Sequence, residues 1–139
     1  MKVGFTGTRR GMTLSQKLAV RELLLLLQPE AVQHGDCVGA DADFHEIATG
    51  LGLLVQIRPC NLSNQRAFCH GIVIANEKPP LERNKDIVFD TNLLIACPGG
   101  ATEELRSGTW ATMRYTRKYS KPLYLVWPDG ATEQENMFP

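Results

Sequence analysis

Short apolar runs alternate with longer segments of helical periodicity along most of the chain. The apolar runs have the length and composition of buried strands. They lie at residues 2–6, 31–34, 53–57, 92–97 and 122–127. The segments between them place apolar residues on one face of a helix. These segments lie at residues 13–28, 41–49, 81–91 and 109–118.

Strands that alternate with helices are typical of a parallel α/β sheet, and right-handed crossovers place helices on both of its faces. We therefore expect a Rossmann-like doubly wound α/β fold of about five parallel strands in the order 3-2-1-4-5. Thr13 is the expected cap of the first helix, and Pro29 ends it. Residues 58–80 show no sustained period, so we expect a functional or mobile loop there.

The length of 139 residues suits one domain with a substantial core. We assign residues 1–127 to that domain and residues 128–139 to a loose C-terminal tail. Lysine and arginine number 15, as do aspartate and glutamate, and this zero net charge argues against a large basic surface for duplex nucleic acid. No apolar run reaches the roughly 18 residues of a membrane span. The chain begins directly with a predicted strand, so we expect a cytoplasmic protein without a signal peptide.

The cysteines show no Cys-x-x-Cys spacing that would indicate a zinc site. Cys97 lies in a predicted core strand and is expected to act as a small apolar residue. Cys60, Cys69 and His70 share one loop region, where a metal site is the weaker alternative to reduced thiols. We therefore predict neither a metal nor a cofactor.

Three glycine-bearing loops follow predicted strands, and the carboxyl ends of parallel strands form the ligand-binding edge of such sheets. The loops are Gly7-Thr8-Arg9-Arg10-Gly11-Met12-Thr13, Gly35-Asp36-Cys37-Val38-Gly39-Ala40-Asp41 and Pro98-Gly99-Gly100. Glycine lets backbone N–H groups approach a ligand closely, although tight turns also require it. The hydroxyls of Ser107 and Thr109, next to a helix start, indicate an anion site for a nucleotide phosphate.

Charged residues beside these loops supply candidate chemistry. The guanidinium groups of Arg9 and Arg10 can hold a phosphate or carboxylate. We predict that Asp36 accepts a ribose hydroxyl and that Asp41 caps the following helix. The predicted ligand-binding residues are Gly7, Thr8, Arg9, Arg10, Gly35, Asp36, Gly39, Ala40, Pro98, Gly99, Gly100, Ser107, Gly108 and Thr109.

Glu103, Glu104 and Arg83 are the candidate catalytic residues. A glutamate near a sugar can stabilise an oxocarbenium ion or activate water, and an arginine can hold the phosphate or base. Together they would cleave an N-glycosidic bond. The alternative interpretation is an ordinary set of ion pairs.

The order and spacing of these motifs resemble the SLOG superfamily, which is similar to Rossmann proteins. The segments that carry the resemblance are Thr6-Gly7-Thr8-Arg9, the loop at residues 35–41, Pro98-Gly99-Gly100 and Ser107-Gly108-Thr109. The superfamily includes the LOG (lysine-decarboxylase-like) phosphoribohydrolases, the DNA-processing protein A family and small proteins of the YspA-like type. The last type is the most similar, and the resemblance covers residues 1 to 127. It implies that these residues form a nucleotide-binding domain.

The chain departs from the LOG enzymes, which cleave nucleoside monophosphates and carry a Pro-Gly-Gly-x-Gly-Thr-x-x-Glu motif with an upstream Arg-Lys pair. Here residues 101–106 separate Gly100 from Ser107, and no glutamate follows Thr109 at the family's offset. The upstream pair is Arg83-Asn84. The resemblance therefore implies nucleotide binding more directly than it implies LOG-type catalysis.

Three functions stay open from the sequence. The first is a nucleotide-binding protein that acts as a sensor, sponge or processing enzyme, and the second is a nucleoside-monophosphate N-glycosidase. The third is a single-strand nucleic-acid module with an aromatic and basic surface, although a packed amphipathic helix explains the same residues more simply. These residues are Trp110, Arg114, Tyr115, Arg117, Lys118 and Tyr119. The resemblance to LOG proteins also implies a homodimer, with Met113, Tyr115 and Tyr119 offering apolar area for the contact.

Overall fold

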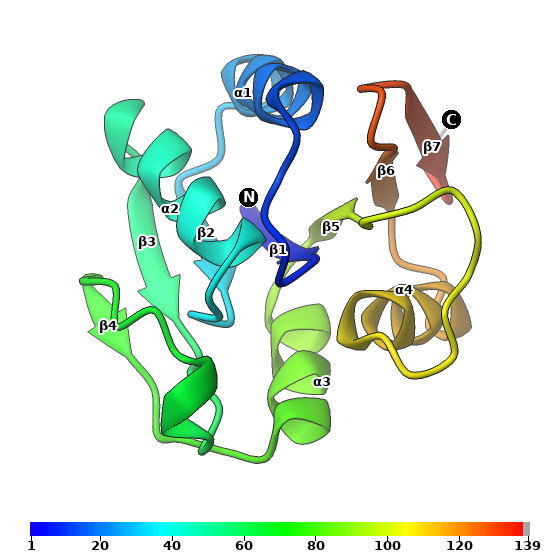
Figure 1. The fold of residues 1–139 in the computed structure, drawn as a ribbon. Coiled ribbons are helices and arrows are strands. Elements are labelled where there is room, and N and C mark those ends of the chain that lie inside the picture. The colour runs from blue at the N-terminus through cyan, green and yellow to red at the C-terminus, as the bar shows by residue number, and fades with distance from the viewer. Residues whose placement is uncertain (138–139) are drawn as a thin grey trace.

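The computed structural model describes residues 1–137 as a seven-stranded sheet with helices on both faces (Figure 1). The strands are β1 (Lys2–Gly7), β2 (Ala31–His34), β3 (Leu54–Ile57), β4 (Val73–Ile74), β5 (Leu93–Cys97), β6 (Leu123–Val126) and β7 (Thr132–Glu135). The helices are α1 (Leu14–Leu27), α2 (Ala40–Gly50), the short 3-10 helix η1 (Ser63–Gln65), α3 (Pro80–Asp90) and α4 (Gly108–Lys118).

The strands lie in the order β4-β3-β2-β1-β5-β6-β7, and all neighbours are parallel except β6 and β7. Helices α1 and α2 lie on one side of the sheet, and α3 and α4 lie on the other (Figure 1). This arrangement confirms the predicted Rossmann-like α/β fold. It also brings the loops after β1, β2 and β5 to one edge, where ligands bind in such folds.

The predicted count of five strands is wrong, because a short strand is added at each edge of the sheet. The five expected strands do lie side by side in the expected order, as β3-β2-β1-β5-β6. Strand β4 has two residues and lies within residues 58–80, so it is too short to show a period. Strand β7 consists of exposed or half-buried polar residues in the segment expected to be a loose tail. Its pairing with β6 draws that segment into the sheet.

Local sequence signals explain the ends of α1. Thr13 is its N-cap and forms a reciprocal capping box with Gln16. Gln28 ends the helix in the left-handed conformation, and Pro29 follows it. The prediction that Asp41 caps α2 is wrong, because Gly39 occupies the N-cap position and Asp41 lies in the first turn of the helix.

Two apolar clusters fill the space between the sheet and its helices. One joins the sheet to α1 and α2, and the other joins it to α3 and α4. Every residue of β2, β5 and β6 is buried, as expected for strands covered on both faces. Cys97 is fully buried in the first cluster, which confirms its predicted place in the core. The ends of the strands, rather than their faces, are therefore free to form a site.

No helix in residues 1–137 is both long and apolar enough to span a bilayer.

Candidate functional site

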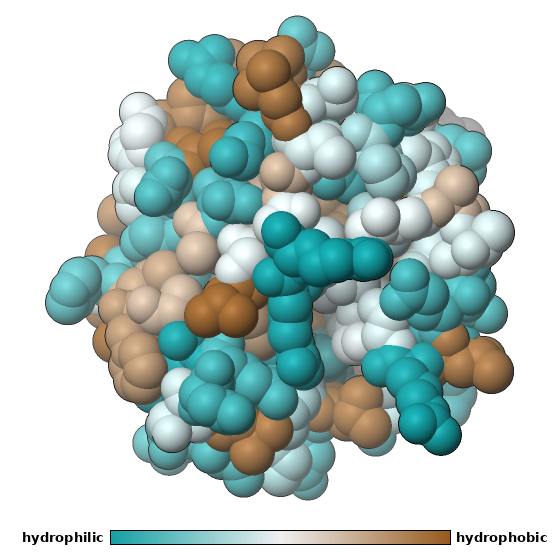
Figure 2. Space-filling model, viewed as in Figure 1, coloured by the Kyte–Doolittle hydropathy of each residue, from teal (hydrophilic) through white to brown (hydrophobic). Residues whose placement is uncertain are grey.

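A cavity of about 670 Å³ opens at the carboxyl edge of the sheet, between the end of β1 and the first turns of α3 and α4. This volume suits a nucleotide-sized ligand, since small-molecule sites commonly enclose about 300–1,000 Å³. Figure 2 shows long hydrophilic side chains across the middle of the corresponding face. The predicted residues that line the cavity are Gly7, Thr8, Arg9, Arg10, Gly35, Arg83, Glu104, Ser107, Gly108 and Thr109.

Several predicted residues lie outside this cavity. They are Asp36, Gly39, Ala40, Pro98, Gly99, Gly100 and Glu103. The hydrogen bonds below show that most of them support the cavity from behind. The predicted loops meet at this cavity, and the structure separates the residues that line it from those that hold the loops in place.

The loop after β1 is anchored by backbone hydrogen bonds to two neighbouring segments. The Thr8 N–H donates to the Cys97 carbonyl at 3.1 Å, and the Thr8 carbonyl accepts from the Ala40 N–H at 2.9 Å. Gly39 has a φ of 91°, and a Cβ there would lie 2.2 Å from the Arg9 carbonyl oxygen. Gly39 and Ala40 therefore let the start of α2 pack closely against this loop, and this contact fixes the backbone that carries Arg9.

The segment after β5 supports Arg10. A Cβ on Gly99 would lie 2.4 Å from Nη2 of Arg10, so a larger residue there would displace the guanidinium group from this position. The Pro98 carbonyl accepts a hydrogen bond from Nε2 of the buried Gln16 at 2.9 Å. Gly100 has open space around it. This segment places Arg10 over the end of β5 but does not itself line the cavity.

Asp36 is not placed to contact a ligand in the cavity. Its side chain is fully buried, and its carboxylate accepts hydrogen bonds from Nε of Arg66 at 3.0 Å and from the Cys69 N–H at 2.8 Å. Asp36 also has a φ of 58°, which turns the chain after β2. Its role is to hold residues 66–69 against the sheet.

Asp41 lines the cavity, although Asp36 was the aspartate predicted to contact the ligand. Its carboxylate accepts from the Cys37 N–H at 3.1 Å. Burial raises the pKa of Asp41 to about 6, and the nearby Arg83 acts in the opposite direction. Burial, followed by Asp41, raises the pKa of the Cys37 thiol to about 11, so this cysteine is not an activated nucleophile.

Arg83 forms the floor of the cavity and is only 5% exposed. Its guanidinium donates to the Gly35 carbonyl, to the Arg58 carbonyl at 3.2 Å and to Oδ1 of Asn84 at 2.8 Å. A Cβ on Gly35 would lie 2.4 Å from Nη1 of Arg83, so the glycine makes room for it. Arg83 is thus held by protein acceptors, whereas the sequence predicted that it holds a substrate.

The first turn of α4 lines the opposite wall. Ser107 is the N-cap, and its Oγ accepts from the Trp110 N–H at 3.4 Å. The N–H groups of Gly108 and Thr109 belong to a turn that has no intrahelical acceptors for them, and the helix dipole makes this end partly positive. A Cβ added to Gly108 would have one neighbour within 4 Å, the Nδ2 atom of Asn84 at 3.8 Å, so the space beside this glycine is open. An anion can therefore approach this backbone closely.

Arginine side chains dominate the charge around the cavity. The charged lining residues are Arg9, Arg10, Arg83, Arg106 and Arg114, against Asp41 and Glu104. Arg106 and Arg114 were not predicted to bind the nucleotide, although both are close in sequence to Ser107 and the start of α4. A protein with no net charge thus concentrates positive charge at one cavity. The arrangement favours an anionic ligand.

The predicted aromatic and basic surface of α4 is only partly present. Trp110 is 5% exposed and Met113 is fully buried, because both pack in the cluster between the sheet and α4. Tyr119 is 46% exposed and packs edge-on against Phe89, with ring centres 4.8 Å apart. Trp110 is therefore not available as a stacking platform, and Met113 is not available for a dimer contact. The homodimer itself stays a prediction.

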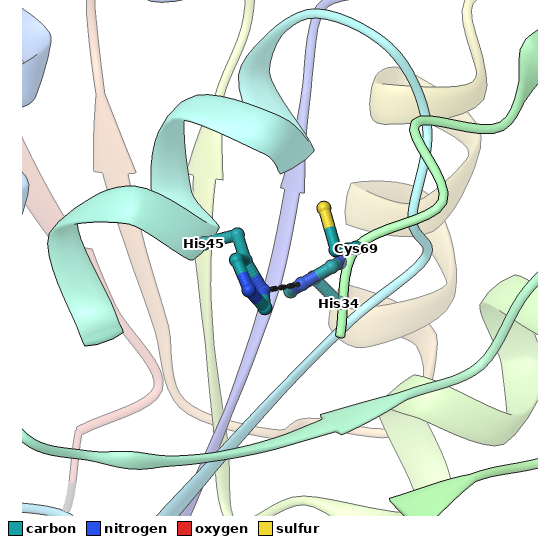
Figure 3. A group of neighbouring side chains, drawn as sticks. All are labelled: His34, His45 and Cys69. Atoms are coloured by element: carbon teal, nitrogen blue, oxygen red, sulfur yellow. Dashed lines mark hydrogen bonds between the residues drawn. The ribbon is translucent and has the colours of Figure 1, made fainter. Parts of the chain in front are cut away.

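A separate cluster on the α2 side of the sheet joins His34, His45 and Cys69 (Figure 3). The possible ligand atoms of these side chains lie within 4.8 Å of one another. The Asp36 N–H donates to Nδ1 of His34 at 2.9 Å, so the proton of neutral His34 is on Nε2. Nε2 lies 2.9 Å from Nδ1 of His45 and donates to it.

This hydrogen-bond chain does not suit a metal ion. A metal bound to His34 needs the lone pair of Nε2, which carries the proton that His45 accepts. Burial, followed by the neighbouring Asp36, raises the pKa of the Cys69 thiol to about 12, so this cysteine is a neutral thiol beside the two histidines. In this arrangement the two histidines are structural partners.

We predict that His34 makes the fold sensitive to acid. Burial, reinforced by His45, lowers the pKa of His34 from 6.5 to about 3. Between pH 6.5 and about pH 3, His34 is protonated in the unfolded chain but stays neutral in the folded chain. The free energy of unfolding therefore decreases as the pH falls through this range. Between pH 7 and pH 5, the wild type should lose about 2 kcal/mol more stability than His34→Gln.

Urea unfolding of both proteins at several pH values measures this difference. The raised pKa of Asp41 acts in the opposite direction, but it is present in both proteins and largely cancels in the comparison. Parallel stability curves for the two proteins would show that His34 does not titrate as described.

Comparisons with known proteins identify the fold. No protein-family model matches the chain, and no curated protein matches it in sequence. The molybdenum cofactor binding protein from the phototrophic bacterium Rippkaea orientalis superposes with a TM-score of 0.70 at 19% identity, over 91% of this chain and 76% of that one.

Two DNA processing proteins A are also similar in structure. The protein from Streptococcus pneumoniae has a TM-score of 0.64 at 18% identity, over 89% of this chain and 49% of its own. The protein from Helicobacter pylori has a TM-score of 0.63 at 20% identity, over 90% and 64%. The chain thus spans about half to two thirds of each. It has the Rossmann-like fold of these proteins, in agreement with the fold that the resemblance to the SLOG superfamily implies.

Proposed function

We propose that the chain binds a nucleotide or a nucleotide-derived phosphate ester in the cavity at the carboxyl edge of the sheet. One observation carries the proposal: five arginines and the first turn of α4 surround a single cavity of about 670 Å³. Guanidinium groups and free backbone N–H groups are the donors that phosphate oxygens accept from.

Different parts of the cavity wall suit the phosphate and the base of a nucleotide. The phosphate lies against the N–H groups of Gly108 and Thr109, within reach of the arginines at the cavity mouth. The apolar side chains of Leu81, Ile87 and Leu105 also line the cavity and offer a surface for a base. Asp41 supplies a carboxylate at the floor that can accept a hydrogen bond from a sugar hydroxyl.

The structural neighbours support a ligand of this kind. One is described as binding the molybdenum cofactor, and another as binding single-stranded DNA, which carries phosphate groups. The local geometry favours a small ligand here, because Trp110 is buried and Arg117 on α4 is paired with Glu135.

Glu103 and Glu104, the proposed catalytic glutamates of an N-glycosidase, both face arginines. Glu104 lies 3.6 Å from Nη2 of Arg10, and Glu103 lies 3.6 Å from Nη1 of Arg114. A carboxylate that acts on an anomeric carbon must reach the sugar, but Glu103 lies outside the cavity lining. With one of the two glutamates outside the cavity, binding without bond cleavage is the function that the geometry supports best.

A thermal-shift panel tests the proposal. Ligands that bind only the folded state raise its melting temperature, so at least one nucleoside mono- or diphosphate should stabilise the protein. The matching nucleoside without phosphate is the control and should give a much smaller shift at the same concentration. Millimolar nucleotides that leave the melting temperature unchanged would contradict the proposal.

A further inference from the structure

Two glutamates of the loop between β5 and α4 neutralise arginines of the cavity. The distances are 3.6 Å from Oε1 of Glu104 to Nη2 of Arg10, and 3.6 Å from Oε1 of Glu103 to Nη1 of Arg114. The arginines come from different elements, the loop after β1 and helix α4, and both line the cavity. The carboxylates thus reach the arginines that an anionic ligand would use.

Both ion pairs are loose. A separation of 3.6 Å exceeds the distance of a charge-assisted hydrogen bond, which is about 2.7–2.9 Å. The side chains of Arg10 and Glu104 are 68% and 55% exposed, so water screens their attraction. Nη1 of Arg114 is buried and has no hydrogen-bond partner in the described residues. This guanidinium therefore has donor capacity that Glu103 does not satisfy.

The loop that carries the glutamates is weakly attached. It contains no helix or strand between Cys97 and Gly108. Within the loop the Ser107 N–H donates to the Glu104 carbonyl, and from α4 the Arg114 guanidinium donates to the Leu105 carbonyl. The side chain of Leu105 is 80% exposed and contributes little packing. Moving the two carboxylates away from Arg10 and Arg114 thus disturbs few contacts.

From these observations, and resting on the proposed function, we propose that Glu103 and Glu104 determine which anions the cavity accepts. In the free protein they stand in for ligand oxygens on Arg114 and Arg10. A ligand that uses both arginines must displace both carboxylates, whereas a ligand that uses one arginine displaces only one. The two glutamates therefore compete with bound anions, and they weaken the binding of a diphosphate-bearing ligand more than that of a monophosphate.

The test compares inorganic phosphate with pyrophosphate, measured by calorimetry at fixed ionic strength. The double variant Glu103→Gln/Glu104→Gln should bind pyrophosphate about tenfold more tightly than wild type, because two competing charges are gone. Its affinity for phosphate should rise only about threefold, because phosphate displaces one carboxylate.

A matched control is Glu22→Gln/Glu133→Gln, which removes two exposed charges from α1 and β7. It should change either affinity by less than about twofold, since long-range charge effects are screened by salt. The single variant Glu104→Gln should give an intermediate result. All variants change exposed side chains, so their melting temperatures check that each is folded.

The outcomes separate this inference from the proposed function. If wild type binds pyrophosphate but the double variant binds it no more tightly, the inference is wrong and the proposed function stands. Weaker binding by the double variant also overturns it, since the glutamates would then contact the ligand. If no protein binds either anion, the inference fails, and the nucleotide panel decides the proposed function separately.

Discussion

Replacing Arg83 with methionine should destabilise the fold by about 3 kcal/mol, the cost expected when one partner of a buried charge network is removed. Arg83 donates to the carbonyls of Gly35 and Arg58 and to the side chain of Asn84. Without it these buried acceptors lose their donor, and the Asp41 carboxylate loses the charge that opposes its burial.

Urea unfolding measures this effect, with Arg106→Met as the control, because Arg106 lines the same cavity but is exposed. The control should change stability by no more than about 0.5 kcal/mol. Adding Asp41→Asn to Arg83→Met should recover about 1 kcal/mol, because it removes the unpaired buried charge. A stability loss for Arg83→Met no larger than for the control would mean that Arg83 is not the structural floor described here.

Replacing Arg9 with alanine should weaken phosphate-ligand binding by about 1.5–3 kcal/mol, the value of a hydrogen bond to a charged group. Arg9 is exposed at the cavity mouth. No ion pair or side-chain hydrogen bond of Arg9 is found within residues 1–137, so its loss should leave the free energy of unfolding nearly unchanged.

Calorimetry with the best nucleotide from the panel measures the change in affinity. Arg21→Ala is the matched control, since Arg21 is exposed on α1, away from the cavity lining. It should bind like wild type. Equal affinity for Arg9→Ala and Arg21→Ala would place Arg9 on the solvated surface, outside the site.

Local signals in the sequence predicted most of the fold. The capping residue Thr13 and the stop at Pro29 locate α1 because both act through adjacent backbone. Buried strands are visible as apolar runs, whereas β4 and β7 are not. One is too short to show a period, and the other is a polar edge strand held by its pairing with β6.

The roles of individual site residues depend on contacts that are distant in sequence. Asp36 and Asp41 lie in the same loop, and which one faces the cavity depends on the left-handed turn at Asp36 and on its ion pair with Arg66. The burial of Arg83 depends on the missing side chain of Gly35, which is 48 residues away. Neither relation leaves a periodic signal in the sequence.

The most direct test of the account is to map nucleotide binding onto the backbone by NMR. Titrating the isotope-labelled protein with the best nucleotide should shift the amide signals of Thr8, Gly108 and Thr109 most, because their backbone surrounds the expected phosphate position. The amides of α1, which lies on the other face of the sheet, should change little. Saturable binding whose largest shifts lie outside the cavity, or no shifts at millimolar nucleotide, would contradict the claim that this cavity is the phosphate-binding site.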